Sequence, residues 1–356
     1  MRALPRNGRK RPATLEEVAL LAGVSRATAS RVFTDNPRVS PDARRSVERA
    51  AQKLGYVPNR AARSLVTGRS DSIGVVIPEP TSRLFGEPFW PSLVRGISDE
   101  LRERDLQLVL FAPQSPADSA RLEHYVTSGH VDGALLVSLH GSDPLPVRLA
   151  ERGVPVVVGG RPLGGQEVSY VDVDNVAGAV AAVDHLLQTG RHRVATITGP
   201  QDMSAGIDRL EGYRSALAAA GVPLDEELIE EGDFGQESGR RAMAALLQRR
   251  PDLDAVFCAD DLMAAGALRE LKDSGRRVPE DVALVGYDDS AIATSTEPPL
   301  SSVRQPIEEL GREMTRLLLA GIAAKARVPR RVILAAELVV RRSSEGATGE
   351  GVRMTR

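Results

Sequence analysis

The sequence has almost no sulfur chemistry, few aromatic rings and no long apolar run. It holds one cysteine, Cys258, among 356 residues, so no internal disulfide can form, and a reducing compartment fits. No apolar run approaches the ~20 residues that a membrane span requires. The charged N-terminus also lacks the apolar core of a signal peptide. These absences predict a cytoplasmic protein, and the length of 356 residues predicts two or three domains.

The signatures of common enzyme classes are missing as well. The glycine-rich stretch "GGRPLGG" (159–165) lacks the Gly-Lys-Ser/Thr of a phosphate-binding loop, no GxGxxG follows a strand, and there is no GxSxG elbow. The five histidines show no metal-ligand spacing. Paired carboxylates such as Asp260–Asp261 do not by themselves indicate acid–base catalysis. We therefore expect no enzyme activity, no metal site and no cofactor.

Charge is distributed unevenly along the chain. Residues 1–70 hold fifteen basic and five acidic side chains, whereas the remainder holds 31 basic and 43 acidic ones. A basic head on an acidic body indicates that one end meets a polyanion. Five of the basic residues lie in 1–13, which we predict to be a disordered tail, so charge alone leaves a plain basic tail as an alternative.

Residues 14–57 carry the signatures of three short helices. Thr14, Ser25 and Ser40 are each placed to cap one helix. Gly23 allows a tight turn after the first helix, and Gly55 ends the third. Helix, glycine turn and short helix in this order predict a helix-turn-helix headpiece.

The second of these helices, "RATASRVF" (26–33), has little to bury. Only Ala29, Val32 and Phe33 can join a core, and two arginines and several small or hydroxyl side chains point elsewhere. In a major groove an arginine can bind guanine O6 and N7, and small side chains can meet a thymine methyl. The alternative is a three-helix bundle with a solvated face.

The stretches "TLEEVALLAGVSRATASRVF" (14–33) and "RVSPDARRSVERAAQKLGYVPNRAARSL" (38–65) resemble the LacI/GalR transcriptional regulators, and the resemblance continues to about residue 342. It implies a nucleoid-associated protein, a repressor that binds a palindromic duplex operator. Ala29 stands where the family usually has valine, and Thr34 where asparagine is usual. The positions that read bases in the family fall on Arg26, Ala27, Arg31 and Leu65. Those that hold phosphates fall on Thr14, Ser25, Thr28, Ser30, Tyr56, Asn59, Arg60 and Arg63.

Residues 58–71 are predicted to be a linker with a helical centre. Asn59 can cap a short helix that ends near Leu65, too short to be stable alone. A plain interdomain linker is the alternative. The resemblance implies a hinge helix that pairs with its mate from a second copy in the minor groove, with Leu65 wedged between base steps. Because the tail 343–356 has no leucine heptads, we expect it to be disordered and the protein to be a homodimer, not a tetramer.

Residues 72–342 alternate apolar runs with helical patterns. Runs such as "SIGVVIP" and "VALVGYDD" predict buried strands of parallel sheets, and helical patterns cover 175–189, 206–220, 235–249 and 261–274. This predicts a doubly wound α/β fold long enough for two lobes. The resemblance implies a periplasmic-binding-protein-like effector and dimerisation domain with crossovers near 172–175, 301–304 and 320–328. Lobe 1 is then expected at about 72–172 and 304–320, and lobe 2 at about 173–303 and 321–342.

Polar residues follow several of the predicted strands, where doubly wound sheets bind ligands. Carboxylates such as Asp260 and Asp288, with Arg209, could hold the vicinal hydroxyls of a sugar. Phe85 and Phe89 could stack on its C–H face. The alternatives are helix caps for the carboxylates and core packing for the aromatics.

The resemblance assigns Arg209, Asp260 and Asp288 to effector contacts and Phe234 to a pocket wall. We interpret the effector as a small sugar, a mono- or oligosaccharide, which acts by shifting the lobe arrangement. One alternative is a purine or nucleoside co-repressor. Another is a sugar-binding protein without a regulatory role, which a salt-dependent mobility shift with duplex DNA would exclude.

Overall fold

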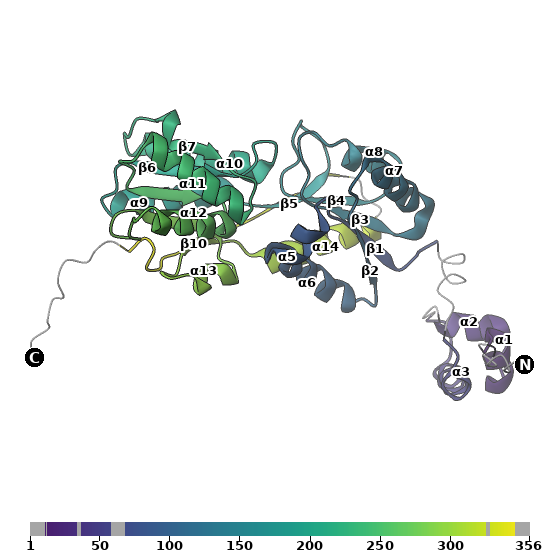
Figure 1. Cartoon of the computed structure of the whole chain (residues 1–356). Helices are drawn as coiled ribbons and strands as arrows, with labels where there is room; N and C mark the ends of the chain where they lie inside the picture. Colours follow the sequence, from purple (N-terminus) through teal and green to yellow (C-terminus); the bar gives the residue numbers. More distant parts are fainter. Residues whose placement is uncertain (1–10, 12, 34–36, 58–67, 325–327, 346–356) are drawn as a thin grey trace, which may run out of the picture. The chain divides into compact units, whose positions relative to one another are not determined.

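The computed structural model describes residues 11, 13–33, 37–57, 68–324 and 328–345, which form two compact units that divide after Asp71 (Figure 1). We call them the N-terminal and C-terminal units and describe each by itself. Within the described ranges, every helix is too short or too polar to cross a bilayer.

Three helices form the N-terminal unit: α1 (Leu15–Ala22), α2 (Arg26–Phe33) and α3 (Pro41–Leu54). The predicted caps are confirmed. Thr14 and Glu17 form a capping box, in which the Glu17 amide donates to Thr14 Oγ1 at 3.3 Å and the Thr14 amide donates to Glu17 Oε2 at 2.7 Å. Ser25 Oγ accepts from the Thr28 amide at 3.0 Å. Gly23 ends α1 at φ 68°, in the left-handed region that the tight turn requires.

The interior of this unit is small. The buried side chains among its described residues are Val18, Ala19, Ala29, Val32, Val47, Ala50 and Ala51. As predicted, α2 buries little: Arg26, Ala27 and Arg31 are exposed. Ala29 is fully buried, so the usual valine is replaced there by a smaller core side chain. Thr34 lies outside the described residues.

Two six-stranded sheets build the C-terminal unit and divide it into two lobes (Figure 1). The lobe 1 sheet has the order β11-β5-β4-β3-β1-β2 and is parallel throughout. The lobe 2 sheet has the order β12-β10-β9-β8-β6-β7, with only β12 antiparallel. The strands are β1 (Ser72–Val76), β2 (Gln107–Phe111), β3 (Gly133–Leu136), β4 (Val156–Gly159), β5 (Ser169–Val173), β6 (Val194–Thr198), β7 (Ile229–Glu231), β8 (Ala255–Cys258), β9 (Ala283–Asp288), β10 (Ser301–Arg304), β11 (Arg331–Leu334) and β12 (Glu337–Val339).

Helices cover both faces of each sheet, as a doubly wound fold requires. Lobe 1 carries α5 (Thr81–Gly86), α6 (Phe89–Arg102), α7 (Pro116–Tyr125), α8 (Leu145–Glu151) and α14 (Ile307–Ala324). Lobe 2 carries α9 (Asn175–Gln188), α10 (Ser204–Ala219), α11 (Gln236–Arg249), α12 (Asp261–Asp273) and α13 (Ala291–Ser295). Short turns of π-helix (Val126–His130) and 3₁₀-helix (Glu226–Leu228) also lie in the C-terminal unit.

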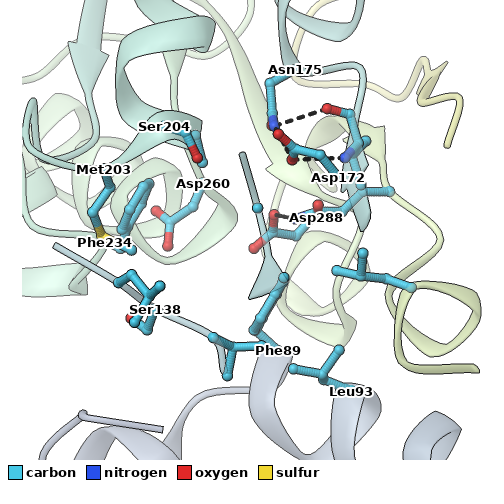
Figure 2. A pocket seen from close by; sticks show the side chains of 18 of the residues that line it. Phe89, Leu93, Ser138, Asp172, Asn175, Met203, Ser204, Phe234, Asp260 and Asp288 are labelled. Atoms are coloured by element: carbon cyan, nitrogen blue, oxygen red, sulfur yellow. Dashed lines mark hydrogen bonds between the residues drawn. The ribbon is translucent and has the colours of Figure 1, made fainter. Parts of the chain in front are cut away.

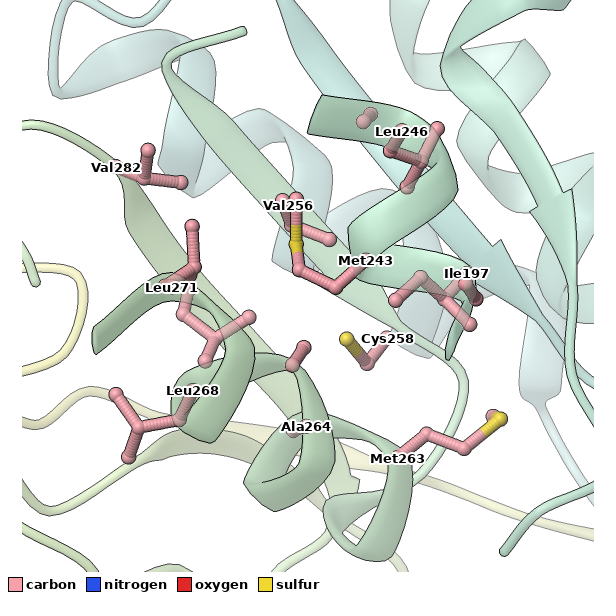
Figure 3. Packing of buried hydrophobic residues seen from close by; sticks show 14 of the residues in the cluster. Ile197, Met243, Leu246, Val256, Cys258, Met263, Ala264, Leu268, Leu271 and Val282 are labelled. Carbon is pink, nitrogen blue, oxygen red and sulfur yellow. The ribbon is translucent and has the colours of Figure 1, made fainter. Parts of the chain in front are cut away.

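The lobe 2 core shows why its strands read as unbroken apolar runs. Met243 and Leu246 of α11 and Leu268 of α12 belong to one buried cluster with Val256 and Cys258 of β8 (Figure 3). The other face of the same sheet packs on α9 and α10, so β8 is buried on both sides. The single cysteine is thus a core residue, and burial raises the pKa of its thiol well above the usual range.

The chain passes between the lobes at 173–175, 304–307 and 334–337. The prediction of the third crossover near 320–328 is wrong. Helix α14 continues to Ala324, and β11 then pairs with β5 in the lobe 1 sheet, so 321–324 and 331–334 belong to lobe 1. The sequence of the short strand "RVIL" does not indicate which of the two sheets it joins.

The predicted end of the domain at residue 342 is also too early. Ser343 and Ser344 are buried, and Ser343 Oγ donates to the Leu284 carbonyl at 2.6 Å. His185 Nε2 lies 2.7 Å from Ser344 Oγ. The small polar residues of this glycine-rich tail predicted disorder. Ser343 instead forms hydrogen bonds with the backbone of the neighbouring strands β9 and β10. Residues 346–356 lie outside the described part.

Candidate ligand pocket and nucleic-acid interface

A pocket lies between the lobes, where the carboxyl ends of both sheets meet (Figure 2). Lobe 1 contributes Phe89 and Ser138, and lobe 2 contributes Arg209, Phe234 and Asp288. Because the strands of each sheet are parallel, their carboxyl ends lie at the same edge, and the loops that follow them converge here. Of the predicted effector residues, the structure brings five of six together.

Arg209 is the most fixed of them. It lies on α10 with 5% of its surface exposed. Its Nε donates to Asn175 Oδ1 at 2.9 Å, Nη1 donates to the Ala259 carbonyl, and its guanidinium lies 3.7 Å from the ring centroid of Tyr287. Nη1 is also 3.9 Å from Asp288 Oδ1. The protein therefore holds this side chain rigidly and largely pairs it before any ligand arrives.

Asp288 and Asp260 face the same cavity from the ends of β9 and β8. Burial raises the pKa of Asp288 to about 6, against the lowering effects of Arg209 and of the hydrogen bond from Gln305. Burial and the nearby Asp288 raise the pKa of Asp260 well above its usual range. Asp260 Oδ1 also accepts from the Met263 amide at 2.7 Å, so it caps α12 while it lines the pocket. The helix-cap interpretation of Asp260 is confirmed, and its contact with an effector stays a prediction.

The neighbouring Asp261 carries a testable pH dependence. Burial, with Asp288 nearby, raises its pKa to about 7. In the unfolded chain the pKa of an aspartate is about 3.9. Between these values the unfolded state releases a proton that the native state keeps, so this contribution to stability falls as the pH rises.

We therefore expect Asp261→Asn to flatten the fall in melting temperature between pH 5 and pH 7.5. The measurement is thermal unfolding of both proteins across this range. Asp273→Asn, at the end of the same helix, is the matched control and should unfold with the wild-type profile. Identical wild-type and Asp261→Asn profiles would contradict the assignment.

Aromatic side chains form the apolar walls. Phe89, on α6, meets Trp90 edge to face with ring centroids 4.9 Å apart, and both line the pocket. Phe234 follows β7 with φ 65°, and its ring covers Gly199 so closely that a Cβ there would lie 2.2 Å from its Cζ. The prediction for Phe85 is wrong: it is 73% exposed and is not part of the lining, because α5 turns Leu84 inward instead.

The sequence analysis did not identify a polar cluster on the lobe 1 side of the pocket, which is centred on Glu79. Glu79, after β1, is 4% exposed and accepts a hydrogen bond from Ser138. Arg83 Nη1 lies 3.2 Å from Glu79 Oε2. Burial opposes ionisation of Glu79, but the hydrogen bonds and the charge of Arg83 outweigh it and lower its pKa. The strand-end position in "VIPEP" was the available signal, since it parallels those of Asp260 and Asp288.

Two contacts across the cleft each pair a basic side chain of lobe 1 with a carboxylate of lobe 2. His140 Nδ1 of lobe 1 lies 3.0 Å from Asp202 of lobe 2, and Arg161 of lobe 1 pairs with Asp208 of lobe 2. The carboxylates of Glu79 and Asp202 raise the pKa of His140. Asp202 thus bridges the lobes instead of lining the cavity. Complementary charge favours the lobe arrangement seen here.

In the N-terminal unit, the exposed face of α2 presents Arg26, Ala27 and Arg31. Tyr56 lies 5.3 Å from Phe33, centroid to centroid. The Ser25 hydroxyl is used in the cap of α2 and lies 2.9 Å from the Thr28 hydroxyl. Thr14 caps α1, and Ser30 is half-buried on α2. The other four predicted contacts, Asn59, Arg60, Arg63 and Leu65, lie outside the described residues.

Residues 14–59 match the bacterial regulatory proteins of the lacI family, and residues 183–344 match a periplasmic binding protein-like domain. The HTH-type transcriptional regulator CelR of Thermobifida fusca is 54% identical over 94% of this chain and 99% of its own length. The chain belongs to the LacI family. It is a sequence-specific DNA-binding transcriptional regulator with a two-lobe effector domain.

Solved structures agree with this assignment. A transcriptional regulator CelR–cellobiose complex is 52% identical, with a TM-score of 0.75 over 94% of this chain and 100% of that one. A lac repressor dimer bound to operator and an anti-inducer is 27% identical, with a TM-score of 0.82 over 94% of this chain and 99% of that one. The predicted fold class is confirmed by these matches.

Proposed function

We propose that this regulator represses carbohydrate-utilisation genes and that a disaccharide such as cellobiose, bound between the lobes, sets its affinity for the operator. The observation that carries the proposal is the pocket itself. Arg209 and buried carboxylates of lobe 2 face Phe89 and Trp90 of lobe 1 across it. The similarity to a CelR–cellobiose complex supports this choice of sugar.

The chemistry of the pocket favours an uncharged, hydroxyl-rich ligand. The three arginines among its described lining residues are already engaged by protein carboxylates: Arg83 by Glu79 and Glu87, Arg161 by Asp208, and Arg209 by Asp288. Within the described part of the chain, no arginine of the pocket is therefore held ready for a phosphate. Carboxylates accept hydrogen bonds from vicinal hydroxyls, and a carboxyl with a raised pKa can also donate one. Ring faces cover the apolar C–H face of a pyranose.

Regulation follows from linkage. The ligand touches both lobes, so it stabilises one lobe arrangement over another, and residues 58–71 connect lobe 1 to the headpiece. A ligand shifts such an equilibrium only by its difference in affinity for the two states, typically about 1–3 kcal/mol.

On the DNA side, the proposal assigns base reading to Arg26, Ala27, Arg31 and Leu65. The phosphate contacts are assigned to Thr14, Ser25, Thr28, Ser30, Tyr56, Asn59, Arg60 and Arg63. The exposure of Arg26, Ala27 and Arg31 on α2 supports the first assignment. The capped start of α2 supports the second, because a helix N-terminus offers its free amides to phosphate.

The test combines thermal shift with operator binding. Cellobiose should raise the melting temperature and change operator affinity at least fivefold, whereas adenosine, guanine and a phosphorylated disaccharide should do neither. Stabilisation by a purine would overturn the sugar assignment. Stabilisation by cellobiose with unchanged operator affinity would leave a sugar-binding protein without a regulatory role.

We expect a homodimer in solution and one dimer on each operator. One short recognition helix gives too small a surface for tight specific binding, so two copies on a palindrome are required. Residues 346–356 contain no leucine heptads of the kind that form a coiled coil. Light scattering on the full-length protein, alone and with operator duplex, measures this. A stable tetramer would contradict the argument from the tail, and a monomer on DNA would contradict the hinge pairing.

A further inference from the structure

An acidic side chain lies against the first residue of the proposed recognition helix. Glu16, in the first turn of α1, places Oε1 2.6 Å from Nε of Arg26, and both side chains are largely exposed. Its neighbour Glu17 is already used in the capping box with Thr14. Acidic residues in a first helical turn are stabilised by the helix dipole, which explains a carboxylate at this position but not its contact with α2.

The geometry of the contact matters because a guanidinium has five N–H donors in a fixed, planar arrangement. A carboxylate on the Nε side uses one edge of the group. It leaves the two terminal nitrogens as a fork, the arrangement that matches guanine O6 and N7. An arginine held in this way also loses less side-chain entropy when it binds a base.

We propose that Glu16 is a positioning residue for base recognition: it orients Arg26 toward guanine and so sets the sequence preference of the headpiece. The proposal rests on the base-reading role assigned to Arg26 above. Glu16 does not touch DNA; it acts through the arginine.

The Glu16 carboxylate also weakens nonspecific binding to duplex DNA. Glu16 lies close enough to Tyr56, an assigned phosphate contact, that its charge adds to burial in raising the pKa of the tyrosine. A negative charge at this edge repels the backbone of any duplex, whatever its sequence. Only a site where Arg26 finds its base compensates for this repulsion, and such a penalty on wrong partners increases specificity.

The test uses full-length Glu16→Gln, Arg26→Ala and the double variant. Glu48→Gln, which removes the same charge from an exposed position on α3, is the matched control. Affinity is measured by fluorescence anisotropy at several salt concentrations for three duplexes: the operator, the operator with a single guanine pair exchanged at the position where Arg26→Ala loses preference, and a random sequence. Thermal unfolding checks that each headpiece stays folded.

We expect Glu16→Gln to bind random duplex several-fold more tightly and to lose about fivefold in discrimination at the exchanged guanine, with an unchanged melting temperature. A further variant, Glu16→Asp, keeps the negative charge on a shorter side chain and should retain part of the discrimination that Glu16→Gln loses. In the double variant, Glu16→Gln should cause no further loss. Glu48→Gln should keep wild-type discrimination.

The outcomes distinguish the base-reading role of Arg26 from the positioning role of Glu16. If Arg26→Ala keeps the wild-type base preference at every position, the reading role of Arg26 is wrong and the inference falls with it. If Arg26→Ala loses preference at a guanine while Glu16→Gln discriminates as the wild type does, only the inference is overturned. Independent, additive losses in the double variant would likewise overturn it.

Discussion

Arg209→Ala is expected to abolish the response to the effector and to destabilise the C-terminal unit by about 3–5 kcal/mol, because it leaves buried carboxylates without their cation. Arg209 bonds Asn175 and the Ala259 carbonyl and lies 3.9 Å from Asp288. Denaturant unfolding and ligand titration by calorimetry measure the two effects separately.

Two further variants show whether lost binding is only lost folding. Asp288→Asn removes a buried carboxyl whose pKa is raised to about 6, so it should keep the fold and still weaken sugar binding at least tenfold. Arg214→Ala, on the same helix but half exposed, should change neither property. If Asp288→Asn responds at the wild-type ligand concentration, the pocket is assigned wrongly.

Leu65→Ala is expected to weaken operator binding by about two orders of magnitude while binding to random duplex stays nearly unchanged. An apolar wedge contributes only where the duplex is kinked, and unstacking a base step costs a few kcal/mol that the wedge offsets. Leu65 lies outside the described residues, so this prediction rests on the sequence and the family. Anisotropy titrations with operator and random duplex give the ratio.

Leu20→Ala serves as the control for Leu65→Ala. Leu20 is 85% exposed on α1, so truncating it removes a similar apolar side chain from the same unit. It should leave the ratio of operator to random binding unchanged. Equal losses on both duplexes in Leu65→Ala would exclude the wedge.

Local chemistry was readable from the sequence. The caps of Thr14, Ser25 and Ser40 depend on residues three positions apart, and the structure shows all three. The helical patterns of lobe 2 agree with α9 to α12 within two residues at each end, because periodicity and capping are properties of neighbouring residues. The strand-end positions of Asp260 and Asp288 were likewise visible.

Only the tertiary structure decided what depends on pairing between distant segments. It added β11 to the lobe 1 sheet and buried Ser343 and Ser344, since a four-residue strand or a polar tail does not encode its partner. It turned Phe85 outward, and it joined His140 to Asp202 across the cleft. The sequence thus determined the elements and the kinds of chemistry they carry, while long-range packing decided which side chains meet and how strongly burial changes their protonation.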